Sequence, residues 1–158
     1  MIKYCLKKWD ANKDKLEQFY RTTTGWNECR YLDIVKAVVT YVLNDSAGVA
    51  PYDDYETWSV DEITEIDNGC SNHGTLLFLI PEYTSQPTEY EYLMTYAGYG
   101  SCSICDTLTA IQRYGKGQYL TDVQIKSFMA LSKDIITNMK KPYNCGWRNE
   151  EEFDEVEQ

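Results

Sequence analysis

Apolar residues recur at helical spacing in three segments of the chain, residues 10–24, 30–43 and 121–140. In the second segment they follow one another at intervals of three or four positions, at Leu32, Val35, Val39 and Val42. The third segment opens with Thr121 and Gln124, whose spacing fits a capping box. Its apolar stripe consists of Phe128, Leu131, Ile135 and Met139. These patterns predict three amphipathic helices, each with one buried face.

The middle of the chain changes to the patterns of strands. Residues 75–80 form a continuous apolar run, which is typical of a central strand covered on both faces. Residues 89–98 alternate, so that Leu93, Thr95 and Ala97 share one face, and residues 58–67 give a third strand with poorer alternation. A turn is expected at Asn68-Gly69 and a short helix over residues 106–114. The sequence thus predicts a single α+β domain over residues 1–149, with an antiparallel sheet packed against about four helices, and an acidic tail at 150–158.

Four residues have the spacing of a metal site. A C-x-x-H pair and a C-x-x-C pair stand on either side of the predicted hairpin, and the only histidine of the chain belongs to the first pair. Zinc takes thiolate and imidazole ligands in a tetrahedron, commonly from two such close pairs. The pattern therefore predicts one structural Zn²⁺ in a knuckle at one end of the sheet. Its ligands would be Cys70, His73, Cys102 and Cys105.

The register of the hairpin favours the same site. If the turn centres near Gln86, residues equidistant from it lie opposite each other. Cys70 would then face Cys102, and His73 would face Tyr99. Two alternatives remain open for these cysteines, a redox-active C-x-x-C pair and unrelated core cysteines.

The other three cysteines are Cys5, Cys29 and Cys145. They are expected to be buried free thiols, although Cys145 could replace one of the proposed ligands. Disulfides would suit an exported protein. The first ten residues are polar and lysine-bearing rather than a signal peptide, and no apolar run suits a membrane span. The expected location is therefore the cytoplasm, where thiols stay reduced.

An enzyme is not expected. The segment 101–105 before a helix resembles the C-x-x-C half of zinc nucleobase deaminases, which also need a glutamate two residues after a ligand. His73 is followed instead by Gly74 and Thr75, and four protein ligands would leave no position for a catalytic water. The chain has no second histidine for an acid–base relay, no P-loop and no G-x-S-x-G motif.

Charge indicates the kind of partner. With 25 acidic and 15 basic residues, the net charge is −10, which disfavours direct nucleic-acid binding and favours a basic protein. The best candidate surface is an acidic stretch interleaved with aromatic residues, in which Tyr55 or Trp58 would serve as anchors. A solvated loop and strand edge is the alternative. The stretch comprises Tyr52, Asp53, Asp54, Tyr55, Glu56, Trp58, Asp61, Glu62, Glu65 and Asp67.

Two segments carry a family resemblance, Gly69-Cys70-Ser71-Asn72-His73-Gly74 and Tyr99-Gly100-Ser101-Cys102-Ser103-Ile104-Cys105-Asp106-Thr107-Leu108. Over residues 58–113 the chain resembles small acidic proteins encoded by phages of Gram-positive bacteria. It is also similar to zinc-binding anti-CRISPR proteins that inhibit the type II CRISPR effector nuclease. The resemblance implies a stoichiometric inhibitor that binds a basic RNA-guided enzyme in the host cytoplasm. A phage accessory protein with another host target is the alternative, and a zinc-dependent hydrolase or deaminase is a third.

Overall fold

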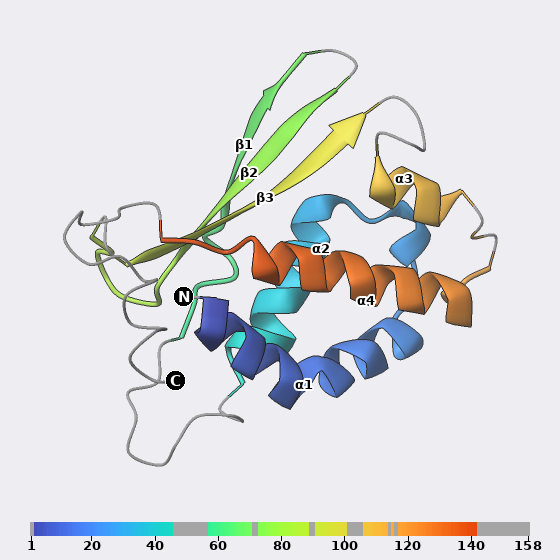
Figure 1. The fold of residues 1–158 in the computed structure, drawn as a ribbon, viewed down its shortest axis with the longest axis horizontal. Helices are drawn as coiled ribbons and strands as arrows, with labels where there is room; N and C mark the ends of the chain where they lie inside the picture. Colours follow the sequence, from blue (N-terminus) through green and yellow to red (C-terminus); the bar gives the residue numbers. More distant parts are fainter. Residues whose placement is uncertain are drawn as a thin grey trace.

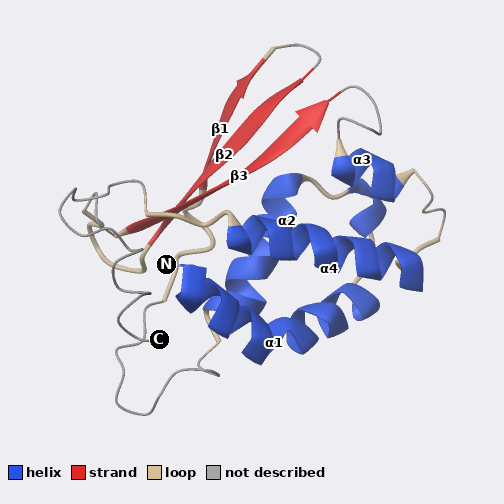
Figure 2. Cartoon of the chain, viewed as in Figure 1, coloured by secondary structure: helices blue, strands red, loops and turns tan. Residues whose placement is uncertain are grey.

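The structure is a computed structural model that describes residues 2–45, 57–70, 73–88, 91–100, 106–113, 115 and 117–141. Figures 1 and 2 show a layer of helices beside one sheet. The helical segments are α1 (Ile2–Thr22), the 3-10 turn η1 (Trp26–Glu28), α2 (Tyr31–Val38), the π-helical turn η2 (Val39–Leu43), α3 (Thr107–Gln112) and α4 (Asp122–Thr137). The strands are β1 (Thr64–Gly69), β2 (His73–Pro81) and β3 (Tyr92–Gly100), antiparallel and in the order β1-β2-β3. The predicted α+β class is confirmed.

Aromatic side chains fill the centre of the helical layer. The ring of Phe128 on α4 lies 5.3 Å from that of Tyr20 and 6.0 Å from that of Trp26, between ring centroids. Tyr20 is fully buried, and its hydroxyl lies 2.7 Å from Ser132 Oγ. Burial of this much aromatic surface is a dominant source of stability, so this layer is the main core of the described chain.

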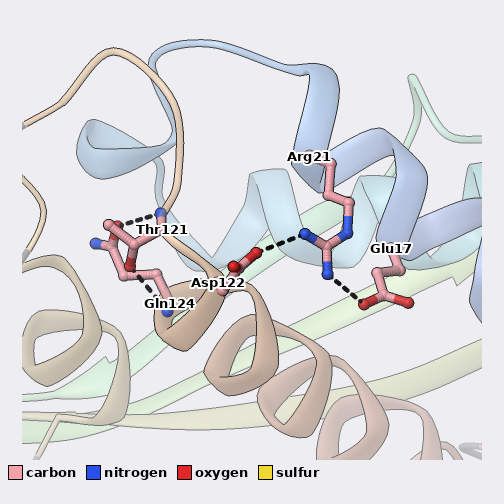
Figure 3. A network of polar contacts seen from close by, with 5 residues as sticks. All are labelled: Glu17, Arg21, Thr121, Asp122 and Gln124. Carbon is pink, nitrogen blue, oxygen red and sulfur yellow. Dashed lines mark hydrogen bonds and ion pairs between the residues drawn. The ribbon is translucent and has the colours of Figure 1, made fainter.

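The start of α4 follows the sequence closely. Thr121 Oγ1 accepts a hydrogen bond from Gln124 N at 3.2 Å, and Thr121 N donates to Gln124 Oε1 at 3.0 Å, which confirms the capping box. Figure 3 shows this box beside Asp122, whose carboxylate accepts from Arg21 of α1 at 2.7 Å. Arg21 also donates to Glu17 at 3.0 Å. The predicted apolar stripe is buried in full, at Phe128, Leu131, Ile135 and Met139.

The first helix is longer than predicted, since α1 begins at Ile2 instead of near residue 10. Its buried residues include Cys5, Trp9, Asn12 and Leu16, at intervals of four, three and four. Two buried residues of this helix are polar, so the sequence does not show a continuous apolar stripe. Lys8 Nζ donates to the carbonyl of Asp45, and Asn12 Nδ2 donates to the carbonyl of Val42 in η2 at 3.0 Å. These hydrogen bonds to the backbone at and just beyond the end of η2 allow both polar side chains to be buried.

The register of the β2–β3 hairpin differs by one residue from the prediction. His73 pairs with Gly100, and Gly74 pairs with Tyr99. The connection runs from residue 82 to 91, so its centre falls between residues 86 and 87 rather than on Gln86. A shift of one residue moves a whole strand's side chains to the other face. In the observed register, Phe78 pairs with Thr95 and Ile80 pairs with Leu93, and all four residues are buried.

The sheet is covered on one face. Phe78, Ile80, Leu93, Thr95 and Ala97 are all buried on the side of the helices. Thr95 Oγ1 donates to the carbonyl of Ile135 in α4 at 2.7 Å, which joins the two layers. On the other face Leu77 and Leu79 are only half-buried, and Ile66 and Tyr96 are exposed. The prediction that β2 is the central strand is confirmed, but its second face is not fully covered within the described residues.

The strand predicted at residues 58–67 lies later in the chain. β1 runs from Thr64 to Gly69, so Asn68 and Gly69 belong to the strand and not to a turn before it. Trp58 makes only an isolated bridge to Glu82. β1 has no buried residue, and its weak alternation follows from its position at the edge of the sheet, where packing places few demands on sequence.

Candidate functional site

Of the two predicted metal pairs, the structure describes Cys70, which directly follows β1, and His73, which begins β2, at the end of the sheet that projects beyond the helical layer in Figure 1. At this end Gly69 of β1 pairs with Gly74 of β2, which pairs with Tyr99 of β3. A Cβ atom on Gly69 would lie 2.8 Å from Gly74 Cα, and one on Gly74 would lie 2.9 Å from the Tyr99 hydroxyl. The glycines are needed because the tyrosine side chain crosses directly over them.

Cys70 and His73 lie close together at this end. The Sγ atom of Cys70 is 3.6 Å from Nδ1 and 3.9 Å from Nε2 of His73, and both residues are exposed. The backbone N–H of Cys70 donates to the carbonyl of His73 at 3.0 Å, which closes the turn between them. The thiol and the imidazole therefore face the same region of space, as two ligands of one ion must.

Cys102 and Cys105 lie outside the described residues, so the ligand set cannot be assembled in full. Among the residues that the structure describes, no group of three or more His, Cys, Asp or Glu side chains could hold a metal. The described residues on either side of this pair do meet. Gly100 N donates to Asp106 Oδ2 at 3.3 Å. Gly100 is also the partner of His73, so the residue that precedes the segment 101–105 lies beside the first pair.

Asp106 connects this end of the sheet to two helices. Its Oδ1 accepts from Thr109 N at 3.0 Å as the N-cap of α3, and from the Tyr31 hydroxyl at 2.7 Å. Tyr31, the first residue of α2, in turn accepts from Leu108 N at 3.1 Å. Burial is the main cause that raises the pKa of Tyr31 above its usual value. One sequence signal points to Asp106, which is a capping type of residue directly after the C-x-x-C pair, and none points to Tyr31.

The other cysteines have different environments. Cys5 is fully buried on α1. Cys29 is half-buried, and burial raises the pKa of its thiol to about 12. Gln112 Nε2 lies 3.6 Å from its sulfur and donates to its carbonyl at 2.9 Å. Cys5 matches the predicted core role, Cys29 is only half-buried and packs against the core, and Cys145 lies outside the described residues.

The predicted partner-binding stretch divides into four parts. The first five members lie outside the described residues, namely Tyr52, Asp53, Asp54, Tyr55 and Glu56. Trp58 is 1% exposed, and its indole N–H donates to the Tyr4 hydroxyl at 3.4 Å, so its side chain belongs to the core. Asp61 and Glu62 are exposed in a turn before β1.

Glu65 and Asp67, the last two members, turn toward the helices. They pair with Phe78 and Leu76, so they share the sheet face that carries the core. Glu65 Oε1 accepts from Arg30 Nη2 at 2.9 Å, and Asp67 Oδ1 accepts from the Tyr99 hydroxyl at 2.7 Å. The described members of the stretch therefore do not share one face.

An open pocket of about 240 Å³ lies between the three strands and helices α2 and α3. Its lining includes Arg30, Glu65, Leu76, Tyr99 and Asp106. Glu65 Oε2 is buried, and it has no hydrogen-bond partner within the described part of the chain. Sequence analysis identified Glu65 as a surface carboxylate, but nothing in the pattern places it in a cavity.

No protein-family model, curated protein or solved structure matched the chain in comparisons with each. A separate observation concerns membranes: no helix in the described ranges combines the length and apolar character needed to cross one.

Proposed function

We propose that one structural Zn²⁺ closes the projecting end of the sheet, with Cys70, His73, Cys102 and Cys105 as ligands. The observation that carries this proposal is the pairing of His73 with Gly100 together with the bond from Gly100 to Asp106. These contacts support the proposal because Gly100, which precedes the C-x-x-C segment, pairs with His73, and Asp106, which follows it, accepts from Gly100. Zinc would there replace the apolar burial that β1 lacks, because its binding free energy is coupled to folding.

The metal content of purified protein tests this site. We expect about one zinc per chain, and we expect Cys102→Ser to lose it because a thiolate ligand is removed. Cys29→Ser is the matched control, since it removes a half-buried thiol that is not among the proposed ligands. Full zinc retention and unchanged thermal unfolding in Cys102→Ser would reject the assignment.

We propose further that the protein acts without chemistry, as an inhibitor that binds a basic, nucleic-acid-handling bacterial protein. The net charge of −10 carries this proposal, because opposite fields steer association and favour a basic partner. A type II CRISPR effector is the specific candidate, since it holds its guide–target duplex in a positively charged channel. The inhibitor would then act in the bacterial cytoplasm, as the resemblance to phage anti-CRISPR proteins implies.

Titration against a guide-loaded type II effector tests this function, with target-DNA binding and cleavage as readouts. We expect inhibition to need at least equimolar protein, because each molecule of a binder blocks one target whereas an enzyme turns over. Potent inhibition far below equimolar amounts would reject the stoichiometric mechanism. If no effector binds, the specific target is wrong, and a pull-down from the bacterial host would test the alternative of an accessory protein with another target.

A further inference from the structure

The two edges of the sheet are protected differently. β1 carries Glu65 and Asp67 on the face toward the helices, and inward-pointing charges are one way in which natural edge strands avoid pairing with another chain. β3 has no charged residue and no proline. Only its first part is closed by the chain itself, because Met94 N donates to the Lys140 carbonyl at 2.7 Å and Lys140 N donates to the Met94 carbonyl at 2.8 Å.

Two residues of β3 have backbone groups that no described residue pairs with. The N–H and C=O groups along an antiparallel strand alternate in direction, so those of Tyr96 and Gly98 point away from β2, as those of Met94 do. The next residue in this series, Gly100, donates to Asp106. Tyr96 and Gly98 have no hydrogen bond on this side within the described part of the chain, and they are the two exposed residues of β3. A short open edge therefore lies between two closed ones.

A groove lies beside this open edge, next to the helices. Its first part is a hollow of about 160 Å³ between β3 and α4, lined by Ala97, Leu131 and Asp134 among others. Its second part is a hollow of about 440 Å³ between α3 and α4, where Ile111 is one of several apolar lining residues. Thr107, Leu131 and Asp134 line both hollows, so the two adjoin.

Backbone geometry and charge limit what can occupy this groove. An extended peptide can add to a sheet edge as a strand, with main-chain hydrogen bonds for affinity and pockets for its alternate side chains. Asp134 is the only charged residue that lines either hollow, and its carboxylate has no hydrogen bond or ion pair among the described residues. A cationic side chain is therefore favoured beside Asp134, and an apolar side chain is favoured in the larger hollow.

We propose that the open edge of β3 binds an extended segment of the protein partner as a fourth strand, antiparallel to β3 as Lys140 is. The residue of that segment that pairs with Gly98 points to the outer face, and its two neighbours point toward the helices. The following neighbour, opposite Ala97, is arginine or lysine beside Asp134. The preceding neighbour is apolar and enters the groove toward α3. The proposal rests on the proposed function for the identity of the partner, a basic protein.

A pentapeptide with this pattern, acetyl-Thr-Leu-Thr-Arg-Thr-amide, tests the groove on the full chain. We expect weak, millimolar binding in an NMR titration, with slower hydrogen exchange at the N–H groups of Tyr96 and Gly98 as the peptide approaches saturation. The same peptide with citrulline in place of arginine is neutral and similar in shape, and it should bind at least threefold more weakly. Equal binding of the two peptides, or shifts confined to other parts of the molecule, would overturn the proposal.

Two methylated peptides separate strand pairing from general attraction of charge. An N-methyl group on the central Thr removes the N–H that would donate to the Gly98 carbonyl, so binding should weaken at least tenfold. An N-methyl group on the Leu is the matched control, because that N–H points away from β3 in the proposed pairing, and binding should change less than twofold. Equal binding of the two methylated peptides would contradict strand addition.

Variants of the edge complete the experiment. Gly98→Pro removes one donor, and proline is tolerated on an edge strand where the N–H faces solvent, so this variant should lose binding of the pentapeptide. Gly98→Ala is the matched control, since it keeps the N–H and the nearest atom to its Cβ would be 4.0 Å away. Asp134→Asn should weaken binding of the arginine peptide several-fold and leave the citrulline peptide unchanged. Full binding by Gly98→Pro would overturn the proposal, and so would unchanged binding of the arginine peptide by Asp134→Asn.

The same variants separate this inference from the proposed function. If the wild-type protein binds a basic partner and Gly98→Pro binds it equally well, the groove is wrong while the function stands. If no basic protein binds but the pentapeptide occupies the groove, the groove stands while the function fails. Protection of Tyr96 and Gly98 that rises with protein concentration, with no peptide present, would mean that a second copy of the chain occupies the edge, and it would overturn the proposal.

Discussion

In the helical layer, Phe128 lies within 6.0 Å of two other aromatic rings, and α4 buries residues along its whole length. At the projecting end of the sheet, β1 buries none of its six residues. There the contacts are a glycine pair under Tyr99, an ion pair from Arg30 to Glu65 and the bonds to Asp106. Exposed ion pairs contribute little. The sheet end thus needs a source of stability that the helical layer does not.

Chelation of zinc should produce the largest effect and should divide the molecule in two. Structural zinc contributes on the order of 10 kcal/mol in small zinc-binding peptides. A strong chelator should therefore speed amide hydrogen exchange in β1 and the first half of β2 more than about a hundredfold.

Helices α1 and α4 should keep their protection, because their core does not include the site. Exchange by mass spectrometry with peptide resolution would measure both regions at once. Equal acceleration in both regions would mean that the sheet end is not a separate unit of stability.

Phe128→Ala should produce the next largest effect, in the helical layer. Removal of a fully buried phenylalanine from a packed core costs about 3–5 kcal/mol in the free energy of unfolding. Urea denaturation measures the loss. Val123→Ala on the same helix is the control, since Val123 is 76% exposed, and it should change stability by less than about 0.5 kcal/mol. Similar losses in both variants would contradict a core centred on Phe128.

Gly74→Ala should cost less and should act on the sheet end alone. The new methyl group would lie 2.9 Å from the Tyr99 hydroxyl and still closer to Gly69 Cα, so the tyrosine or a strand must shift. Overpacking of this kind costs about 1–3 kcal/mol.

Gly98→Ala is the control for this substitution, because the nearest atom to its Cβ would be a carbonyl oxygen 4.0 Å away. We expect no loss from it, and a small gain from reduced freedom of the unfolded chain. Equal stability of the two variants in thermal unfolding would show that the close approach at Gly74 is relieved at no cost.

The two regions also differ in how well their sequence predicts them. In α4, the capping pair Thr121 and Gln124 and the apolar stripe are local signals, and both match the structure. Local signals suffice where one helix packs one face on one core. The start of α1 lacks such a signal, because buried Lys8 and Asn12 donate hydrogen bonds to carbonyls of residues far along the chain.

The sheet end depends on contacts that no local pattern carries. The hairpin was predicted correctly as a hairpin, yet its register was wrong by one residue because a long connection does not fix its own centre. The sequence analysis assigns Glu65 and Asp67 to a surface stretch. Successive side chains of an edge strand point to opposite faces of the sheet, and these two lie on the face toward the helices. The position of Tyr31 beside Asp106 joins residues far apart in sequence, and only the folded chain brings them together.

Cysteine labelling should have the smallest effect on the fold, and it compares the two regions thiol by thiol. The thiolate is the reactive form, and burial raises the pKa of the Cys29 thiol from 9.0 to about 12. At pH 8 its thiolate population is thus about a thousandfold below that of an ordinary thiol.

Cys70 is exposed, so alkylation with iodoacetamide after chelation should modify Cys70 within minutes and leave Cys29 unmodified. With zinc bound, Cys70 should also be protected, since its sulfur would be a metal ligand. Mass spectrometry of peptides identifies each site. Rapid labelling of Cys70 in zinc-loaded protein would remove it from the ligand set. Rapid labelling of Cys29 would mean that its contact with Gln112 at the end of α3 opens as readily as the sheet end.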